Sequence, residues 1–295
     1  MATPASHDEL GPALRPASAQ LSNPDASILH SANCGLIVHR VGRICEAFRG
    51  EARDFARTLQ GHVNDALGST ATTLLYDELL GDEHRFHWFV HLRKPNDYVH
   101  FIHMSDDDED VRELVESDRL EHKGGGNWDR MFEEGSFRET IMVPQHGLVP
   151  AQVDSEELFV PAGRHQTTQT DDQLVHSANA AIVVRRTARV RFRFREQGRR
   201  LGHRWAEGLN RAHAGDLTAL LYEETWGRQD RLHWLIHLRS FECLERLVRH
   251  PGPSLADAPE GNERSDERWS HMFVDGSFSD TILVPHFEGR GLHWP

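Results

Sequence analysis

The chain has 295 residues, 38% of them hydrophobic, and a formal net charge of −13 with histidine counted as neutral. This charge argues against a general nucleic-acid-binding protein, which needs a basic surface to neutralise phosphates, and against docking on anionic lipid. No apolar run in the sequence is long enough to span a bilayer, so we expect no membrane partner.

The first part of the chain carries no sign of a folded element. Residues 1–27 are rich in Ala, Pro and Ser, and they lack the basic start and apolar centre of a signal peptide. We therefore predict a disordered arm over this range. The three cysteines show no pairing pattern, which favours reduced thiols and a cytoplasmic location.

The remainder contains an internal duplication. The tetrapeptide His30-Ser-Ala-Asn33 recurs as His176-Ser-Ala-Asn179, and the nine residues Arg85-Phe-His-Trp-Phe-Val-His-Leu-Arg93 recur as Arg231-Leu-His-Trp-Leu-Ile-His-Leu-Arg239. Such long-range similarity predicts two copies of one unit. We place the copies at 28–146 and 174–290, with a polar linker over 147–173.

Each copy is predicted to contain six elements in the order β-α-β-β-α-β, the ferredoxin-like arrangement. In the first copy they are strands over 34–40, 70–79, 85–93 and 138–143, a helix ending near Gly68 and a second helix from Asn96. In the second copy the strands are 180–186, 217–225, 231–239 and 279–284, and the second helix begins at Ser240. Helices on one face of each sheet leave the other face open, so the two copies can bury these faces against each other.

This order resembles the dimeric α+β barrel superfamily in a tandem, two-copy form. The resemblance covers 28–146 and 174–286, and it rests on element order and on the strand that runs into a helix at His-Leu-Arg239-Ser-Phe-Glu. The superfamily includes antibiotic-biosynthesis monooxygenases, small polyketide cyclases, stress-responsive barrel proteins and chlorite-dismutase-like haem proteins. The resemblance implies an α+β protein whose two ferredoxin-like repeats form an intrachain pseudo-dimeric barrel.

The repeated nine-residue strand carries the candidate chemistry. Its strict alternation puts Arg and His on one face and apolar residues on the other. Residues four apart on a strand are separated by about 13 Å, at roughly 3.3 Å per residue, so the two histidines of one strand cannot bind one metal ion together. An acid on the preceding strand would raise the basicity of the facing histidine. We predict a catalytic set of His, Glu and Arg with acid–base and oxyanion roles: His87, His91, Arg93, Glu78, His233, His237, Arg239 and Glu224. The alternative is a buried polar network between the copies.

A second group of polar residues stands before and within the strands of both copies. As candidates for substrate binding we take His30, Asn33, Tyr76, His176, Asn179 and Tyr222. The alternative for the His-Ser-Ala-Asn segments is a turn in which the Ser and Asn side chains bond the backbone.

These features favour an enzyme that acts on a small molecule. The resemblance implies a cofactor-independent monooxygenase or cyclase of secondary metabolism with an aromatic or polyketide-like substrate. A transition metal or haem is the alternative, with ligands from separate strands drawn from His87, His91, His233 and His237. A non-catalytic small-ligand-binding or stress protein is a third hypothesis. The expected partners are a small-molecule substrate and, as an option, a second copy in a homodimer, with no nucleic acid.

Overall fold

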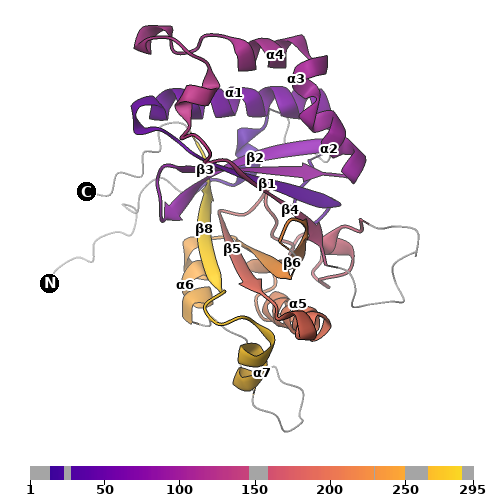
Figure 1. Ribbon diagram of the computed structural model, residues 1–295. Helices are drawn as coiled ribbons and strands as arrows, with labels where there is room; N and C mark the ends of the chain where they lie inside the picture. Colours follow the sequence, from indigo (N-terminus) through magenta and orange to yellow (C-terminus); the bar gives the residue numbers. More distant parts are fainter. Residues whose placement is uncertain (1–13, 23–27, 146–158, 229, 250–264, 288–295) are drawn as a thin grey trace, which may run out of the picture.

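The structure is a computed structural model, and it describes residues 14–22, 28–145, 159–228, 230–249 and 265–287 (Figure 1). The first half contains β1 (Leu36–Arg43), α1 (Arg49–Leu67), β2 (Ala71–Leu80), β3 (Arg85–Leu92), α2 (Pro95–Ile102), α3 (Met104–Asp107), α4 (Glu109–Glu116) and β4 (Arg138–Pro144). The second half contains β5 (Ile182–Arg189), α5 (Arg195–Ala212), β6 (Leu217–Trp226), β7 (Arg231–Leu238), α6 (Phe241–Arg249), α7 (Ser265–Met272) and β8 (Ser279–Pro285). Among the described residues, no helix is both long and apolar enough to cross a membrane.

The eight strands form one closed antiparallel barrel in the order β1-β3-β2-β8-β5-β7-β6-β4. Within the first half the order is β4-β1-β3-β2, and within the second it is β8-β5-β7-β6. The two seams between the halves pair β2 with β8 and β4 with β6. Because the barrel is closed, it has no free sheet edge. A free edge in an open antiparallel sheet can pair with another chain and cause aggregation. The predicted α+β class and the burial of two sheet faces against each other are confirmed.

Side chains alternate between the inside of the barrel and the helices outside it. The middle of the interior is apolar, with Ile37, Leu74, Phe89, Val183, Leu220 and Leu235 in one buried cluster. The outward side chains of β2 and β3 pack under α1, and those of β6 and β7 pack under α5 and α6. Helix α4 lies against α1 (Figure 1).

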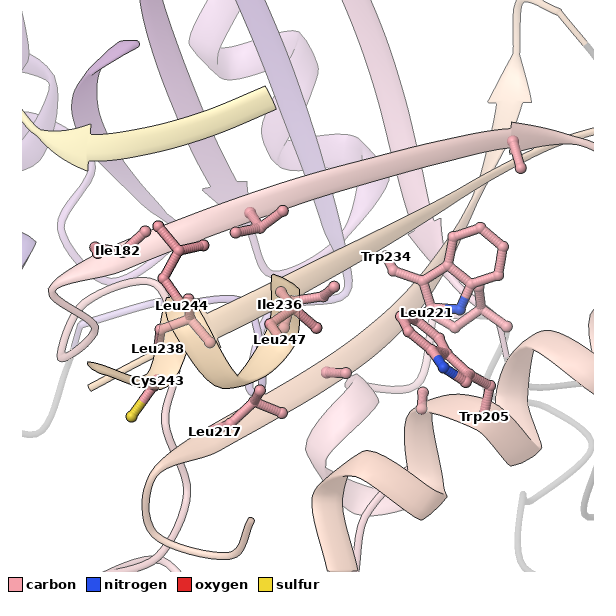
Figure 2. Close-up of a cluster of buried hydrophobic side chains, with 14 of the residues drawn as sticks. Ile182, Trp205, Leu217, Leu221, Trp234, Ile236, Leu238, Cys243, Leu244 and Leu247 are labelled. Atoms are coloured by element: carbon pink, nitrogen blue, oxygen red, sulfur yellow. The ribbon is translucent and has the colours of Figure 1, made fainter. Parts of the chain in front are cut away.

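Tryptophan side chains fill the space between sheet and helices in the second half. Trp205 of α5 meets Trp234 of β7 edge to face, with ring centroids 5.8 Å apart (Figure 2). The Trp234 indole Nε1 donates a hydrogen bond of 3.0 Å to the carbonyl of Gly202. A Cβ atom on residue 202 would lie 2.7 Å from Cζ2 of Trp234, so this approach requires glycine.

Parts of the predicted arm and linker are ordered, and each supplies one glutamine to a seam of the barrel. Gln20 is the last residue of a short 3-10 helix, Ala17–Gln20, and its Nε2 donates to the carbonyls of Leu75 and His286. Its Oε1 accepts from the Leu75 amide. Gln166 makes the matching set with Leu221 and with the carbonyl of Gln145. The structured units therefore extend upstream of residues 28 and 174.

Replacing Gly202 by Ala should lower the free energy of unfolding by about 1–3 kcal/mol, because the added methyl group overlaps Trp234. Urea denaturation of the variant would measure the loss. Gly61 of α1 is the matched control, since nothing lies within 4 Å of a Cβ placed there. Gly61→Ala should raise stability by up to about 1 kcal/mol through helix propensity. Equal effects of the two substitutions would contradict the packing argument.

Candidate functional site

The predicted catalytic histidines all lie inside the barrel, in two polar layers on either side of its apolar middle. His87, His91, His233 and His237 are each at most 1% exposed. His91 and His237 lie at one end of the barrel, together with Ser31 and Ser177; we call this the serine end. His87 and His233 lie at the other end with Arg185, and we call this the arginine end.

At the serine end the two His-Ser-Ala-Asn segments meet each other. The Ser31 amide donates to Oγ of Ser177, and the Ser177 amide donates to Oγ of Ser31, each at 3.0 Å. Asn33 and Asn179 accept from the amides of His30 and His176, respectively, at 2.7 Å, which forms a turn in each segment. The hydroxyls of Tyr76 and Tyr222 donate to the carbonyls of Ser177 and Ser31. These side chains thus hold two turns together across the axis that relates the halves.

Threonine carbonyls determine which nitrogen of the neighbouring histidines carries the proton, and the serine hydroxyls bond the other nitrogen. Nδ1 of His91 lies 3.2 Å from the Thr72 carbonyl, which only accepts, so this nitrogen carries the proton. Nε2 then accepts from Oγ of Ser177 at 2.9 Å. His237 repeats the arrangement with the Thr218 carbonyl and Ser31. Both imidazoles are neutral and fully hydrogen-bonded.

At the same end of the barrel the rings of His30 and His176 stack on each other, with centroids 3.6 Å apart and planes inclined by 11°. Burial, followed by the repulsion of His176, lowers the pKa of His30 to about 2. Burial and the Arg239 charge lower the pKa of His176 to about 4. Burial likewise lowers the pKa of His91 to about 4 and that of His237 to about 3.

Stability should therefore fall on mild acidification. The unfolded chain protonates these four histidines near pH 6.5, whereas the folded chain keeps them neutral to about pH 4 or below. The unfolded state binds more protons in this window. The contribution of these histidines to the free energy of unfolding is therefore complete above pH 6.5 and is lost progressively towards pH 4. Urea titrations at several pH values would measure the slope.

The variant with His30→Asn and His176→Asn gives a control, because it removes two of the four titrating groups. Its slope between pH 6.5 and 5 should be shallower than that of the parent, by at most about 1.4 kcal/mol per pH unit for each group removed. An unchanged slope would show that other groups cause the acid sensitivity.

At the arginine end, four side chains form a directed chain of hydrogen bonds across the barrel. Nη1 of Arg185 donates to Nδ1 of His39 at 2.7 Å, and Nε2 of His39 donates to Nδ1 of His87 at 2.9 Å. Nε2 of His87 then donates to Oε1 of Glu78 at 3.1 Å. Burial alone would raise the pKa of Glu78, but the hydrogen bonds from His87 and the Asp82 amide bring it below its usual range. Burial lowers the pKa of both histidines, so the charge sits on Arg185 and Glu78.

The second half does not reproduce this chain. The residue equivalent to His39 is Arg185, which points to His39 and not to His233. His233 lies 3.6 Å from Oε2 of Glu224, beyond hydrogen-bond distance, and neither ring nitrogen has a hydrogen-bond partner among the described residues. Burial lowers its pKa to about 4.

Two predicted oxyanion ligands lie away from these networks. Arg93 is exposed and donates to the carbonyl of Ser69, and Arg239 is exposed and donates to that of Gly215. The structure therefore brings the histidines together with Glu78 or Glu224, but it does not bring Arg93 or Arg239 to them. Sequence reasoning missed His39 and Arg185, whose positions on β1 and β5 face the histidine row.

Sequence reasoning also missed a cavity of about 250 Å³ between the sheet and the helices of the first half. We call it the first-half cavity. Its floor is the outer face of β1, β3 and β2, its roof is α1, and its sides come from α2, α4 and the segment around Trp128. The wall is mostly apolar, and its described residues are Arg40, Phe55, Leu59, Gln60, Val63, Thr73, Trp88, Val90, Phe101, Ile102, Met104, Val111, Val115, Trp128, Phe132 and Phe137.

One polar atom of this wall lacks a partner. Oγ1 of Thr73 is buried and has no hydrogen bond among the described residues. A buried hydroxyl without a partner costs about 1–3 kcal/mol, which a bound ligand would recover. In the second half the equivalent of Thr73 is Ala219, and the equivalent of Leu59 is Trp205. A comparison of side-chain size and polarity at these two pairs of equivalent positions would have indicated the cavity.

The first-half cavity does not fit a haem, and the described side chains form no cluster suited to a metal ion. They contain no group of three or more His, Cys, Asp or Glu side chains placed to hold a metal ion. The first-half cavity lies below the range of about 300–1,000 Å³ typical for drug-sized ligands, and a haem is larger than those. None of its described wall residues is a His, Cys or Tyr, the common proximal ligands of haem.

Comparison with known families gives one match, over residues 6–291, to a model described as Family of unknown function (DUF6039). The chain belongs to this family. The match spans both halves and the seams between them, so the family corresponds to the whole barrel and not to one repeat. No curated protein matches the sequence.

Several solved structures resemble this DUF6039 member in fold. A candidate monooxygenase from Lactobacillus acidophilus NCFM has a TM-score of 0.50 and 12% identity, over 84% of this chain and 92% of that one. A candidate monooxygenase from Fusobacterium nucleatum gives 0.49 and 8%, over 88% and 94%. A chlorite dismutase variant from Candidatus Nitrospira defluvii gives 0.47 and 10%, over 86% and 92%.

At these sequence identities the similarity concerns the fold alone. The structure of the Lactobacillus protein is the one that supports it. The predicted resemblance to the dimeric α+β barrel superfamily is confirmed at that level. Function must be argued from the sites of this DUF6039 member, because one fold hosts many activities.

Proposed function

We propose that this protein is an enzyme that binds a small, largely apolar molecule in the first-half cavity. An aromatic or polyketide-like compound with one polar oxygen fits the wall, and the reaction would be of the monooxygenase or cyclase type. The single observation that carries the proposal is that a cavity lies between Leu59 and Trp88 in the first half, whereas at the equivalent positions of the second half Trp205 packs edge to face on Trp234. Equivalent positions of a duplication have diverged to hold a ligand in one copy and a packed core in the second. Because equivalent positions can be matched along both halves, we also infer that the halves are two ferredoxin-like repeats.

The few polar groups of the cavity suggest how a substrate would be oriented. Trp88 and Trp128 present aromatic surface, which suits a flat ring. The unpaired Thr73 hydroxyl can bond one oxygen of the ligand. These groups lie on different elements. Together they would fix the orientation of the substrate ring and how deeply it enters the cavity.

Arg40 is the cation of the described wall. Its Nε donates to Oε1 of Glu139 at 2.6 Å, and Oε2 of Glu139 accepts from the Tyr98 hydroxyl at 3.1 Å. This pairing holds the guanidinium in place, and a fixed guanidinium stabilises negative charge that develops on a substrate oxygen. Arg40 therefore takes the oxyanion role that the sequence had suggested for Arg93.

The roles predicted for the barrel histidines remain predictions. At the serine end every ring nitrogen of His91 and His237 already has a partner inside the protein, which favours the buried polar network as their role. At the arginine end His233 has unpaired nitrogens and is the histidine best placed to contact a ligand.

Substituting Leu59→Trp should fill the first-half cavity, as Trp205 fills the equivalent space in the second half. We expect the variant to fold with unchanged or higher melting temperature and to lose binding of 2-naphthol, an aromatic probe with one hydroxyl. Quenching of Trp88 and Trp128 fluorescence and calorimetric titration would measure binding. Leu59→Met, which conserves volume, is the control and should bind as the parent does.

A folded Leu59→Trp variant that still binds the probe would contradict the proposed site. Oxygen uptake and mass spectrometry of a panel of phenols incubated with the parent protein separate an enzyme from a binding protein. A phenol that gains one oxygen atom and loses two hydrogen atoms, with the second oxygen atom of O2 released as water, supports a cofactor-independent monooxygenase if Leu59→Trp abolishes the product. Binding without any product supports the non-catalytic alternative.

A further inference from the structure

A second pocket, of different chemistry, opens at the arginine end of the barrel. Its volume is about 410 Å³, and its described wall consists of Arg185, Thr187, Ala188, Arg189, Arg231, His233, Val274, Asp275, Gly276, Ser277 and Ser279. None of these residues lines the first-half cavity. Three guanidinium groups, one imidazole and several hydroxyls make this wall polar, in a chain whose net charge is −13.

The positive charge of this pocket is only partly neutralised. Neither Arg185 nor Arg189 has a carboxylate within 4.0 Å among the residues that the structure describes. Arg231 lies 3.6 Å from Oε2 of Glu224. Asp275 of the wall is 3.4 Å from Arg191, so its charge is already shared with another guanidinium. Burial lowers the pKa of Arg185 to about 10, which leaves it charged at neutral pH. An excess of cations therefore faces the pocket.

A buried histidine with unused nitrogens belongs to the same wall. His233 is 1% exposed, and both Nδ1 and Nε2 lack a hydrogen bond among the described residues. Buried polar atoms normally have a partner. Nε2 of His233 faces Oε2 of Glu224 at 3.6 Å, so Nδ1 is the ring nitrogen without a partner among the described residues. The hydroxyl of Ser279, bonded to that of Thr187 at 2.9 Å, adds another polar group beside the guanidiniums.

The equivalent surface of the first half is neutralised by its own acids. Arg43, the counterpart of Arg189, lies 3.6 Å from Asp82 and 3.2 Å from Glu133. Arg85, the counterpart of Arg231, lies 3.6 Å from Glu78 and 3.8 Å from Asp82. His87 has hydrogen bonds to Glu78 and His39, where His233 has only Glu224 at 3.6 Å and no hydrogen bond among the described residues. The excess positive charge and the unpaired imidazole are thus particular to the second half.

We propose that the pocket at the arginine end binds the oxyanion group of a small molecule, a carboxylate or a phosphate. Guanidinium groups match the planar, paired oxygens of both groups. His233 and the hydroxyl pair supply hydrogen bonds to the remaining oxygens. The ligand is distinct from the apolar molecule of the first-half cavity, and its binding does not depend on that cavity.

Calorimetric titration of the full chain with inorganic phosphate and, separately, with malonate tests the site. We expect saturable binding of at least one of the two anions, and the tighter one identifies the preferred oxyanion. The double variant Arg189→Gln, Arg231→Gln should raise the dissociation constant by about tenfold or more, because each lost charged hydrogen bond costs about that factor. Both arginines are partly exposed, so the variant should fold.

The matched control is Arg43→Gln, Arg85→Gln, which removes the same charge from the first half. It should leave the dissociation constant within about twofold of the parent value. Equal weakening in both double variants would show a general charge effect and overturn the proposal, as would the absence of binding by the parent. Leu59→Trp should bind the anion normally, so failure of the first-half cavity proposal and failure of this one are distinguishable.

Discussion

Each half of this protein has one sheet face covered by helices and one face that must be covered by the other half, and the rest of the structure depends on that mutual burial. The two faces supply the apolar middle of the barrel, and the two seams remove the free edges. Because the halves are related by a pseudo-two-fold axis, equivalent residues meet each other where the axis crosses the barrel. Ser31 meets Ser177, His30 meets His176, and His39 meets Arg185.

These meetings explain why the two ends of the barrel differ. At the serine end the residues that meet are identical, so the hydrogen bonds of the two serines and of His91 and His237 are reciprocal. At the arginine end the equivalent positions hold His39 and Arg185, and a reciprocal contact is not available. One histidine, His87, receives the whole hydrogen-bond chain, and the other, His233, receives none. The difference between His39 and Arg185 therefore makes this end of the barrel asymmetric.

Much of this architecture was predictable because it follows from local periodicity. The alternation from Arg85 to Arg93 places the histidines on one face, and the duplication implies that two such faces meet. Of the partners of these histidines, Glu78 was predicted from the adjoining strand. His39 and Ser177 were not, because they come from β1 and from the other half, at positions set by the register of strand pairing. The cavity depends on the size of single residues such as Leu59 and Trp205 that have the same hydrophobic character. The glutamines of the seams were missed because Gln20 and Gln166 lie in segments without any periodic pattern.

The glutamine contacts have a consequence for the order in which the chain assembles. Gln20, near the start of the sequence, bonds to Leu75 of β2 and to the carbonyl of His286, just after β8. The β2–β8 seam joins residues that are distant in the sequence, such as Tyr76 and Pro285. Such pairing is slow because the entropy cost of closing the long loop comes before the strand contacts form. During synthesis, β2 therefore has an unpaired edge until the last strand emerges. A chaperone or a neighbouring chain would meet that edge first, and premature release of a truncated product would leave it exposed to edge-to-edge association.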